Sequence, residues 1–332
     1  MIDQPRRSVV AGDLQRVRSV VMDEVSRPGG MLAQALTDLA TRPSKLLRPR
    51  CALLTAHAAS GGKPASEDLI RGAAAIELLH MATLVHDDIV DRAGVRRGAP
   101  ALHLRYGTRA AVLMGDYLFA RTMSLLTQHA NEDNAAMAAR AVGHLIDAEI
   151  AEAYSDPALS ARAYLRRVVG KTAVLFALSF QLGVADHVGA AAPFDPLASH
   201  MRRVGYNFGV AFQITDDMLD MFGDPARTGK PRGLDLRLGL ATLPLILAAR
   251  GSHGRRIARR FERARRSRIA PIQALRLRGL ARDPRLRSGI EVATERVERY
   301  VSRATRSLAT LEAGPARDEL IALVNGVTGR AA

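Results

Sequence analysis

Helical periodicity runs through almost the whole of this 332-residue chain and limits the folds that it can adopt. Apolar residues recur at intervals of three and four, while the alternation typical of strands is scarce. Alanine and leucine, which favour helix, dominate the composition. Clusters of glycine and proline, such as those at residues 28–30, 61–64 and 94–100, divide the sequence into segments of helix length. The sequence therefore predicts an all-α fold of roughly ten or more helices, in one domain spanning residues 1–332, with residues 1–30 as a partly ordered N-terminal segment.

Two aspartate clusters of the form D-D-x-x-D lie in this apolar, helical sequence. They consist of Asp87, Asp88 and Asp91, and of Asp216, Asp217 and Asp220. A helix turns about 100° per residue, so carboxylates four residues apart share one face and lie roughly 6 Å apart. They repel each other unless a cation bridges them, and Mg²⁺ prefers such oxygen ligands together with water and phosphate. One cluster alone could be a solvated helix face, but two in apolar surroundings indicate metal sites that hold a diphosphate between them.

Several basic residues stand beside glycine, proline or the first aspartate cluster, where they can be aimed at phosphate groups. These residues are Lys45, Arg48, Arg96, Arg97, Lys171 and Lys230. The planar fork of arginine suits phosphate oxygens, and lysine can act as a point charge. The sequences around the two glycine-linked lysines do not fit a P-loop. Arg96 and Arg97 could simply pair with the nearby aspartates, but carboxylates filled by a metal ion no longer need them.

The net charge of +15 is compatible with a nucleic acid, a membrane surface or a phosphorylated substrate as partner. Much of the excess lies in residues 255–287, which lack interleaved aromatic residues for base stacking, so we interpret them as a solvated helical face. Cys51 is the single cysteine, which excludes an intrachain disulfide and a cysteine-based zinc site. The N-terminal residues lack the apolar core of a signal peptide, and no run reaches the ~18 apolar residues of a membrane span. We therefore expect a soluble cytoplasmic protein.

Taken together, these motifs resemble those of the trans (E-type) isoprenyl diphosphate synthases, a family that includes the polyprenyl diphosphate synthases. Residues 77–91, ELLHMATLVHDDIVD, followed by Arg96, Arg97 and Gly98, resemble the first aspartate-rich motif of that family, and residues 212–220, FQITDDMLD, resemble the second. Residues 45–49, 171–172 and 229–236 match the remaining motifs in the right order, and the resemblance extends over residues 32–247. It implies an isoprenoid synthase-type helical bundle around a central active-site cavity, a homodimer, and three Mg²⁺ ions per active site.

The resemblance also implies the reaction, in which isopentenyl diphosphate is condensed with an allylic diphosphate, head to tail and in trans, with release of pyrophosphate. The implied metal ligands are Asp87, Asp88, Asp91, Glu152, Asp216, Asp217 and Asp220, with Glu152 standing where many relatives have glutamine. The implied ligands of the allylic diphosphate are Arg96, Lys171 and Lys230, and those of isopentenyl diphosphate are Lys45, Arg48, His80 and Arg97. The residues implied at the reacting centre are Thr172 and Gln213, which join Asp87, Asp91, Lys171, Asp216 and Lys230 in the catalytic set.

The resemblance gives no catalytic role to Leu240 or His86. Leu240 stands where the family often has a second lysine, so one cation near the second aspartate cluster is lost. His86 directly precedes Asp87, and we expect it to have a structural, hydrogen-bonding role.

Product length is expected to depend on Ala82 and Thr83, which lie about one helical turn before Asp87, beside the path along which the product grows. Short-chain relatives often carry an aromatic residue here and this chain has none, so the resemblance favours a product of geranylgeranyl length or longer. Three alternatives stay open. They are a short-chain geranyl or farnesyl diphosphate synthase, a class I terpene cyclase, and a non-catalytic subunit of a heteromeric synthase. We expect no nucleic-acid partner and no stable membrane insertion, only a peripheral membrane contact during product release.

Overall fold

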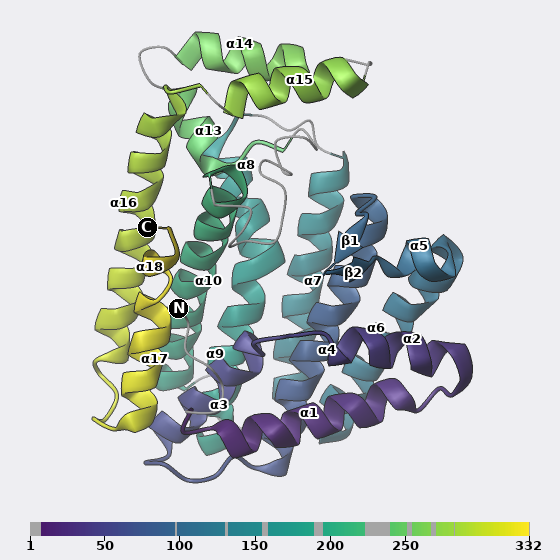
Figure 1. Ribbon diagram of the computed structural model, residues 1–332. Helices are drawn as coiled ribbons and strands as arrows, with labels where there is room; N and C mark the ends of the chain where they lie inside the picture. Colours follow the sequence, from purple (N-terminus) through teal and green to yellow (C-terminus); the bar gives the residue numbers. More distant parts are fainter. Residues whose placement is uncertain are drawn as a thin grey trace.

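The computed structural model describes residues 8–96, 98–129, 132–154, 159–188, 195–222, 240–250, 254–266, 270–281 and 283–331 (Figure 1). Its first helices are α1 (Ala11–Ser26), α2 (Gly30–Thr41), α3 (Leu47–Ala59), α4 (Glu67–Val90), α5 (Leu102–Tyr106), α6 (Thr108–His129) and α7 (Glu132–Tyr154). They are followed by α8 (Ala161–Val168), the π-helix η2 (Val169–Ala173), α9 (Val174–Val188) and α10 (Pro196–Phe222). The C-terminal helices are α13 (Leu243–Ala248), α14 (Gly254–Arg265), α15 (Ala270–Ala281), α16 (Leu286–Leu308), α17 (Pro315–Asn325) and α18 (Thr328–Ala331).

The predicted all-α architecture is confirmed, with one small addition at the predicted loop over residues 94–100. There β1 (Val95–Arg96) and β2 (Ala99–Pro100) form an antiparallel pair in which Val95 lies opposite Pro100. The long helices α4, α6, α7, α9, α10 and α16 form the bundle, while α1 and α2 lie across one end and α14 and α15 across the other (Figure 1).

Helix α4 lies inside the bundle and packs against α1, α3, α6 and α9. It begins at the N-cap residue Ser66, whose hydroxyl accepts a hydrogen bond from the amide of Leu69 over 3.1 Å. Glu67 and Asp68 in its first turn complement the positive end of the helix dipole. Most of the following residues are apolar on every side of the helix, as expected for a helix that is buried all round. This packing fixes the position of the first aspartate cluster at the other end of α4.

Helix α10 approaches η2 and α9 closely because glycines of α10 face them. A side-chain carbon at Gly205 would lie 2.5 Å from the carbonyl oxygen of Phe176, and one at Gly209 would lie 2.5 Å from the Cα of Ala173. Phe176 and Phe208 pack edge to face, with ring centroids 4.8 Å apart, and both are fully buried. Burial of each ring contributes about 1.5–3 kcal/mol to folding. This close contact brings the second aspartate cluster, on α10, next to η2.

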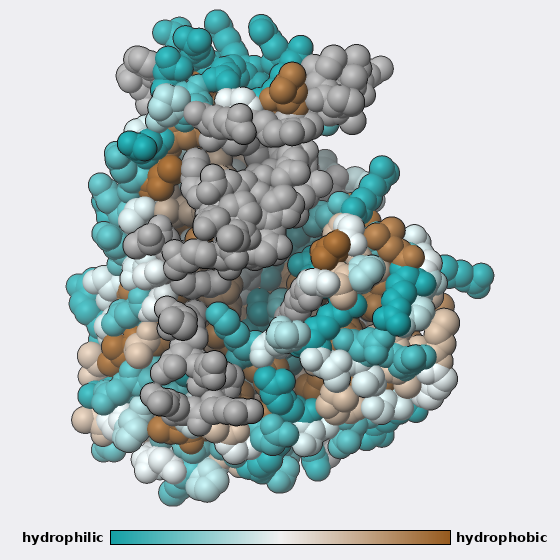
Figure 2. Space-filling model, in the orientation of Figure 1, coloured by the Kyte–Doolittle hydropathy of each residue, from teal (hydrophilic) through white to brown (hydrophobic). Residues whose placement is uncertain are grey.

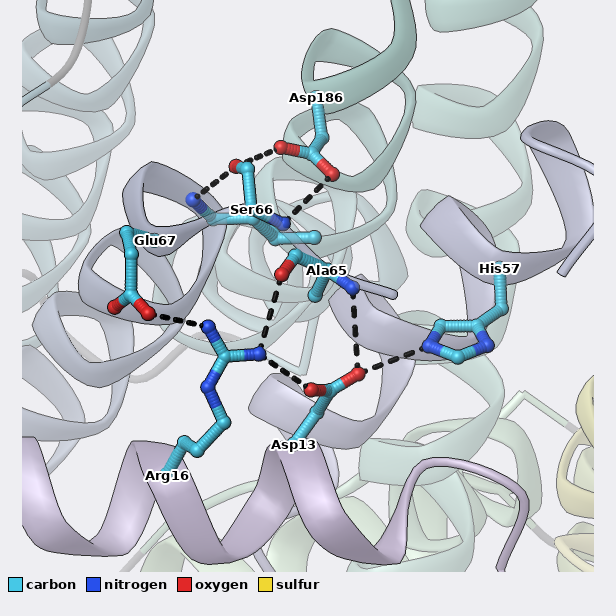
Figure 3. Close-up of polar contacts among 8 residues, drawn as sticks. Asp13, Arg16, His57, Ala65, Ser66, Glu67 and Asp186 are labelled. Atoms are coloured by element: carbon cyan, nitrogen blue, oxygen red, sulfur yellow. Dashed lines mark hydrogen bonds and ion pairs between the residues drawn. The ribbon is translucent and has the colours of Figure 1, made fainter. Parts of the chain in front are cut away.

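A polar network ties α1 to the rest of the bundle (Figure 3). Asp13 accepts a hydrogen bond from Nη1 of Arg16 at 2.7 Å and lies 2.9 Å from Nε2 of His57 on α3. Nearby, the hydroxyl of Ser66 at the start of α4 donates to Asp186 on α9. Burial alone would raise the pKa of Asp13, but the hydrogen bonds to His57 and Arg16 outweigh it and hold that pKa below its ordinary value. Nη2 of Arg16 also donates to Glu67 over 2.6 Å, so the network joins α1 directly to α3 and α4.

Two helical stretches are long and apolar enough to cross a membrane, Glu67–Val90 and Ala161–His187. Within their most apolar windows 72% and 83% of the residues are buried inside the protein. Core helices of a bundle have this composition as well, so internal packing accounts for both stretches.

Candidate active site

The first aspartate cluster lies where α4 ends. Asp87 and Asp91 are one turn apart, and the amide of Asp91 donates to the carbonyl of Asp87 over 2.8 Å. Arg92 then adopts a left-handed conformation with a φ of 51°, and the helix stops. Burial raises the pKa of Asp87. Loss of surrounding water, followed by the charge of Asp87, raises the pKa of Asp91 to about 6, although part of its side chain reaches solvent. The negative end of the helix dipole adds to these charges, so this end of α4 favours a bound cation.

Asp88 turns into the protein and is 5% exposed. Its Oδ1 accepts a hydrogen bond from Nε of Arg96 at 2.7 Å, and Nη2 of the same arginine lies 2.5 Å away. Arg42 in turn donates to the carbonyl of Arg96 over 3.0 Å, which fixes the β1–β2 hairpin beside the end of α4. The predicted metal ligand Asp88 and the predicted diphosphate ligand Arg96 are therefore paired with each other. Arg97, predicted to bind isopentenyl diphosphate, lies outside the described residues.

Lys171 on η2 is surrounded by carboxylates. Its Nζ lies 2.9 Å from Glu149, 2.8 Å from Glu152 and 3.7 Å from Asp87. Burial would lower the pKa of Lys171, but the charges of Asp87, Glu152 and Glu149 outweigh it and raise that pKa. Burial and the charge of Asp87 raise the pKa of Glu149 to about 7. Glu152 also lies 3.3 Å from Arg167. Three carboxylates thus accompany two cations, Lys171 and Arg167, and the remaining negative charge favours the approach of a further cation.

The residue after Lys171 reaches the second aspartate cluster. The hydroxyl of Thr172 donates to Oε1 of Gln213 over 2.7 Å, and Nε2 of Gln213 donates to Asp217 over 2.7 Å. Asp217 also accepts a hydrogen bond of 2.6 Å from the hydroxyl of Tyr164. Burial raises the pKa of Asp217 to about 6, while the bonds from Tyr164 and Gln213 act in the opposite direction. Asp217 therefore fixes the orientation of Gln213, and through it that of Thr172.

In both aspartate clusters the middle carboxylate is buried and the outer two are accessible to solvent. The middle residue is buried and hydrogen-bonded, at 5% exposure for Asp88 and 3% for Asp217. The outer residues remain accessible: Asp87, Asp216 and Asp220 are partly exposed and Asp91 is exposed. This division gives each helix end one pair of accessible carboxylates a turn apart.

The residues predicted to bind isopentenyl diphosphate occupy α4 and the start of α3. Lys45 is exposed and precedes α3, while Arg48 lies in the first turn of α3 with its guanidinium 4.8 Å from the ring centre of Phe176. His80 lies two turns before Asp87 on α4, and its carbonyl accepts a hydrogen bond from Thr83 over 2.8 Å. The geometry does not test these roles, which stay predictions. Lys230 lies outside the described residues.

The two residues predicted to influence product length lie beside apolar packing. Ala82 is 3% exposed in the main core, and Thr83 is half-buried. Leu79, one turn before Thr83, belongs to a separate apolar cluster with Val142, Leu145 and Leu175, against which Phe119 and Met123 of α6 pack. The carboxylates at this end of α4 are thus preceded, two turns earlier along the helix, by an apolar cluster between α4, α6, α7 and α9. The roles of Ala82 and Thr83 stay predictions.

Within the described residues, no group of three or more histidine, cysteine, aspartate or glutamate side chains is arranged to hold a metal ion. A cavity of about 340 Å³ lies between α7, α9 and α10, with Arg140, Leu178 and Arg202 in its wall, and none of the predicted site residues lines it. The chemistry of the site therefore follows from the side-chain contacts at η2, and we assign no role in it to this cavity.

Three participants were not identified from the sequence: Glu149, Tyr164 and the π-helix itself. Glu149 and Glu152 are three residues apart, and this spacing indicates a shared helix face. Nothing local marks Tyr164 as a donor to Asp217. The π-helix coincides with the position of Gly170, where a side-chain carbon would lie 2.3 Å from the Cβ of Ala148. Single π turns inside α-helices frequently occur at functional sites, and here the turn carries two predicted catalytic residues.

Comparison with known proteins agrees with this geometry. The model of the polyprenyl synthetase family matches residues 30–275. The chain is 37% identical over 246 residues to heptaprenyl diphosphate synthase component 2 of Geobacillus stearothermophilus, a match that covers 73% of this chain and 74% of that protein. It is 31% identical over 341 residues to nonaprenyl diphosphate synthase of Mycobacterium tuberculosis, which covers 97% of this chain and 94% of that protein.

Among solved structures, the polyprenyl synthase from Caulobacter crescentus CB15, complexed with calcium and isoprenyl diphosphate, has a TM-score of 0.85 and 31% sequence identity to this chain. The match covers 100% of this chain and 98% of the other.

Proposed function

Because this chain belongs to the polyprenyl synthetase family and is therefore a prenyltransferase, we propose that it condenses isopentenyl diphosphate with an allylic diphosphate, head to tail and in trans. The observation that carries the proposal is the position of η2 between the two aspartate clusters. Lys171 lies 3.7 Å from Asp87 of the first cluster, while its neighbour Thr172 is bonded to Gln213, which is bonded to Asp217 of the second. Two adjacent residues thus connect both clusters into one site.

The accessible carboxylates fit Mg²⁺ as the metal of this site. They are Asp87, Asp91, Asp216 and Asp220, with Glu152 beside Lys171. Oxygen donors in pairs suit a hard cation, and burial, which raises the pKa of both Asp87 and Asp91, disfavours their charged forms unless a cation is bound beside them. Because Mg²⁺ usually completes its shell with water and phosphate oxygens, it needs only one or two carboxylates from the protein, which each accessible pair can provide. Bound Mg²⁺, three ions in our proposal, would neutralise the charge that develops on the departing pyrophosphate.

The chain's own residues bind and orient the substrates around this site. Lys171 keeps a positive charge next to Asp87, and its flexible side chain can move from the carboxylates to the allylic diphosphate. Arg96 is held in place by Asp88, so its guanidinium adds positive potential at the same end of α4. Thr172 and Gln213 hold their polar groups in a fixed orientation beside Lys171. The apolar cluster around Leu79 keeps water away from the growing allylic chain, so that the alkene of isopentenyl diphosphate reacts first.

We propose a product of geranylgeranyl length or longer. Two observations support it: neither Ala82 nor Thr83 is aromatic, and the relatives named above are heptaprenyl and nonaprenyl diphosphate synthases. Since the heptaprenyl relative is named as a component, a partner chain is an alternative to the homodimer that we expect. Exposed apolar side chains on α6 and α7, including Leu113 and Ile150 at 57% and 53% exposure, favour an assembly face on these helices.

The test is an incubation of the purified chain with labelled isopentenyl diphosphate, Mg²⁺ and, in separate reactions, dimethylallyl, geranyl, farnesyl and geranylgeranyl diphosphate. The proposal predicts that label enters a longer prenyl diphosphate, that EDTA stops the reaction, and that chromatography of the dephosphorylated products shows chains of twenty carbons or more. The alternatives predict different results. A terpene cyclase would consume the allylic diphosphate without incorporating label, a short-chain synthase would stop at geranyl or farnesyl products, and a non-catalytic subunit would give no product alone.

A further inference from the structure

One short part of the chain carries most of its net charge. Residues 254–281 contain ten arginines and one glutamate, a net charge of +9 out of +15 for the whole chain. These residues form α14 and α15, which pack against each other across one end of the bundle (Figure 1). Hydrophilic side chains gather there on the face seen in Figure 2. A surface that is only solvated needs polar residues, but these need not all carry the same sign of charge. What this positively charged surface can bind depends on how the arginines are distributed over it.

Helix α14 separates its apolar and basic residues onto opposite faces. Ile257, Phe261 and Ala264 follow helical spacing and are at most 1% exposed. Leu277 and Leu280 of α15 are equally buried, and because the two helices pack against each other, their apolar faces cover one another. The opposite face of α14 is formed by exposed arginines at intervals of three and four. These are Arg255, Arg256, Arg259 and Arg263, which we call the basic face.

The acidic groups close to this face pair with other arginines. Asp283 forms ion pairs with Arg260 and with Arg285, and Glu262 lies 3.5 Å from Arg266. Within the described residues, the four arginines of the basic face form no ion pair with an aspartate or glutamate. Their charge is therefore directed to the outside of the protein.

The edge of the basic face includes α15. Nη1 of Arg276 donates to the carbonyl of Arg263 over 3.3 Å, so Arg276 adds its charge to the same surface. Its neighbour Leu275 is 69% exposed. An exposed leucine beside several arginines is a combination that suits the interface of an anionic lipid layer, where the charges meet headgroups and the apolar side chain enters the boundary region.

We propose that the basic face of α14, together with Arg276 and Leu275 of α15, binds the surface of an anionic phospholipid membrane. A single-stranded nucleic acid is less suitable, because Phe261 is fully buried and cannot stack on bases. A duplex is less suitable because it is bound through its phosphates, which offer no apolar partner to the exposed Leu275. The proposal also rests on the proposed function, since a long prenyl diphosphate carries an apolar tail that has to leave the protein for a lipid phase. The apolar side of α14 is already buried, so the contact is electrostatic and peripheral, without insertion of the helix.

The test is sedimentation of the full-length chain with vesicles of phosphatidylcholine alone or of phosphatidylcholine with phosphatidylglycerol, in the absence of substrate. Binding is expected with the anionic vesicles and should weaken as salt is added, because exposed charges are screened. Each basic residue close to an anionic surface changes the partition coefficient about fivefold, so the variant R255Q/R256Q/R259Q/R263Q should bind about 10²- to 10³-fold less. The matched control removes four exposed arginines of α16, in the variant R287Q/R299Q/R303Q/R306Q, and should bind nearly as well as the wild type.

Three outcomes overturn the proposal: equal binding to neutral and anionic vesicles, equal losses in the two variants, or no vesicle binding by a chain that binds labelled duplex DNA or RNA through the basic face. The prenyl transfer reaction with soluble substrates is measured on the same samples. Vesicle binding is measured without substrate, so an inactive chain that still binds would contradict the proposed function alone. An active chain that does not bind anionic vesicles would contradict the membrane contact alone.

Discussion

The contact between His86 and Gly115 tests how the end of α4 that carries the first aspartate cluster packs against α6. His86 precedes Asp87 on α4, and its imidazole lies against α6, with Nε2 3.3 Å from the carbonyl of Val112. A side-chain carbon at Gly115 would lie 2.1 Å from Nε2, 2.5 Å from Cδ2 and 2.8 Å from Cε1 of that ring. Such distances are impossible, so Gly115→Ala has to displace the imidazole.

The size of the effect follows from two opposing contributions. The displaced atoms are the end of a side chain that is 41% exposed, so moving them costs at most the ~3 kcal/mol of overpacking in a closed core, while replacing glycine by alanine inside a helix gains about 0.5–1 kcal/mol. The net effect of Gly115→Ala is thus expected to range from a gain of about 1 kcal/mol to a loss of about 2.5 kcal/mol. In a His86→Ala background the ring is gone, so the same substitution should stabilise the protein by about 0.5–1 kcal/mol. The coupling between the two positions equals the steric cost and is therefore expected to be positive and at most about 3 kcal/mol.

Urea denaturation of the wild type, the two single variants and the double variant measures this coupling. Gly143→Ala on α7 is the matched control, since a side-chain carbon there meets nothing within 4 Å, and it should stabilise the protein with or without His86. If Gly115→Ala changes the free energy of unfolding by the same amount in both backgrounds, the imidazole does not occupy this space and the reasoning is refuted.

Three other substitutions test separate parts of the structure. Tyr164→Phe removes a hydrogen bond to the buried Asp217 and should lower the free energy of unfolding by about 1–3 kcal/mol in urea denaturation; an unchanged value would mean that the bond is dispensable. Because the pKa of Asp13 is lowered by folding, the contribution of its carboxylate to stability is complete above the ordinary pKa of about 3.9 and is lost as the pH falls through the folded value. Asp13→Asn should therefore remove this part of the dependence of the free energy of unfolding on acid. Identical pH profiles of unfolding in the variant and the wild type would argue against this role. Ala82→Phe should shorten the product in chromatography by at least one isoprene unit, because a ring obstructs apolar space that cannot easily repack, and an unchanged product would remove Ala82 from the path.

Local patterns were sufficient to predict the helices and the position of the carboxylates along them. Spacing of four residues places Asp87 with Asp91 on one side of α4, and the structure keeps both accessible. The breakers at residues 94–100 correctly end that helix, although they form a β-hairpin there. These features depend on residues close together in the sequence, which is why the sequence alone reveals them.

Contacts between distant segments could not be predicted in the same way. The pairing of Asp88 with Arg96 and the bond from Tyr164 to Asp217 depend on which side of each helix faces the core, and the clusters carry apolar neighbours on several sides. The same limitation applies to Lys171, whose carboxylate partners come from α4 and α7. Sequence reasoning therefore predicted charged residues for the site but missed Glu149, and the partners of the predicted residues became visible only from the packing of whole helices.

The central claim is that η2 joins the two aspartate clusters into a single metal-dependent site for prenyl transfer. The most direct measurement is the single-turnover incorporation of labelled isopentenyl diphosphate into a longer product by the wild type, Asp87→Asn and Asp216→Asn over a series of Mg²⁺ concentrations. Each substitution preserves side-chain size but removes one negative ligand, so each should slow incorporation by at least about 10²–10³-fold, with circular dichroism unchanged and no incorporation in EDTA. Near-normal incorporation by either variant, or incorporation that continues in EDTA, would contradict the claim.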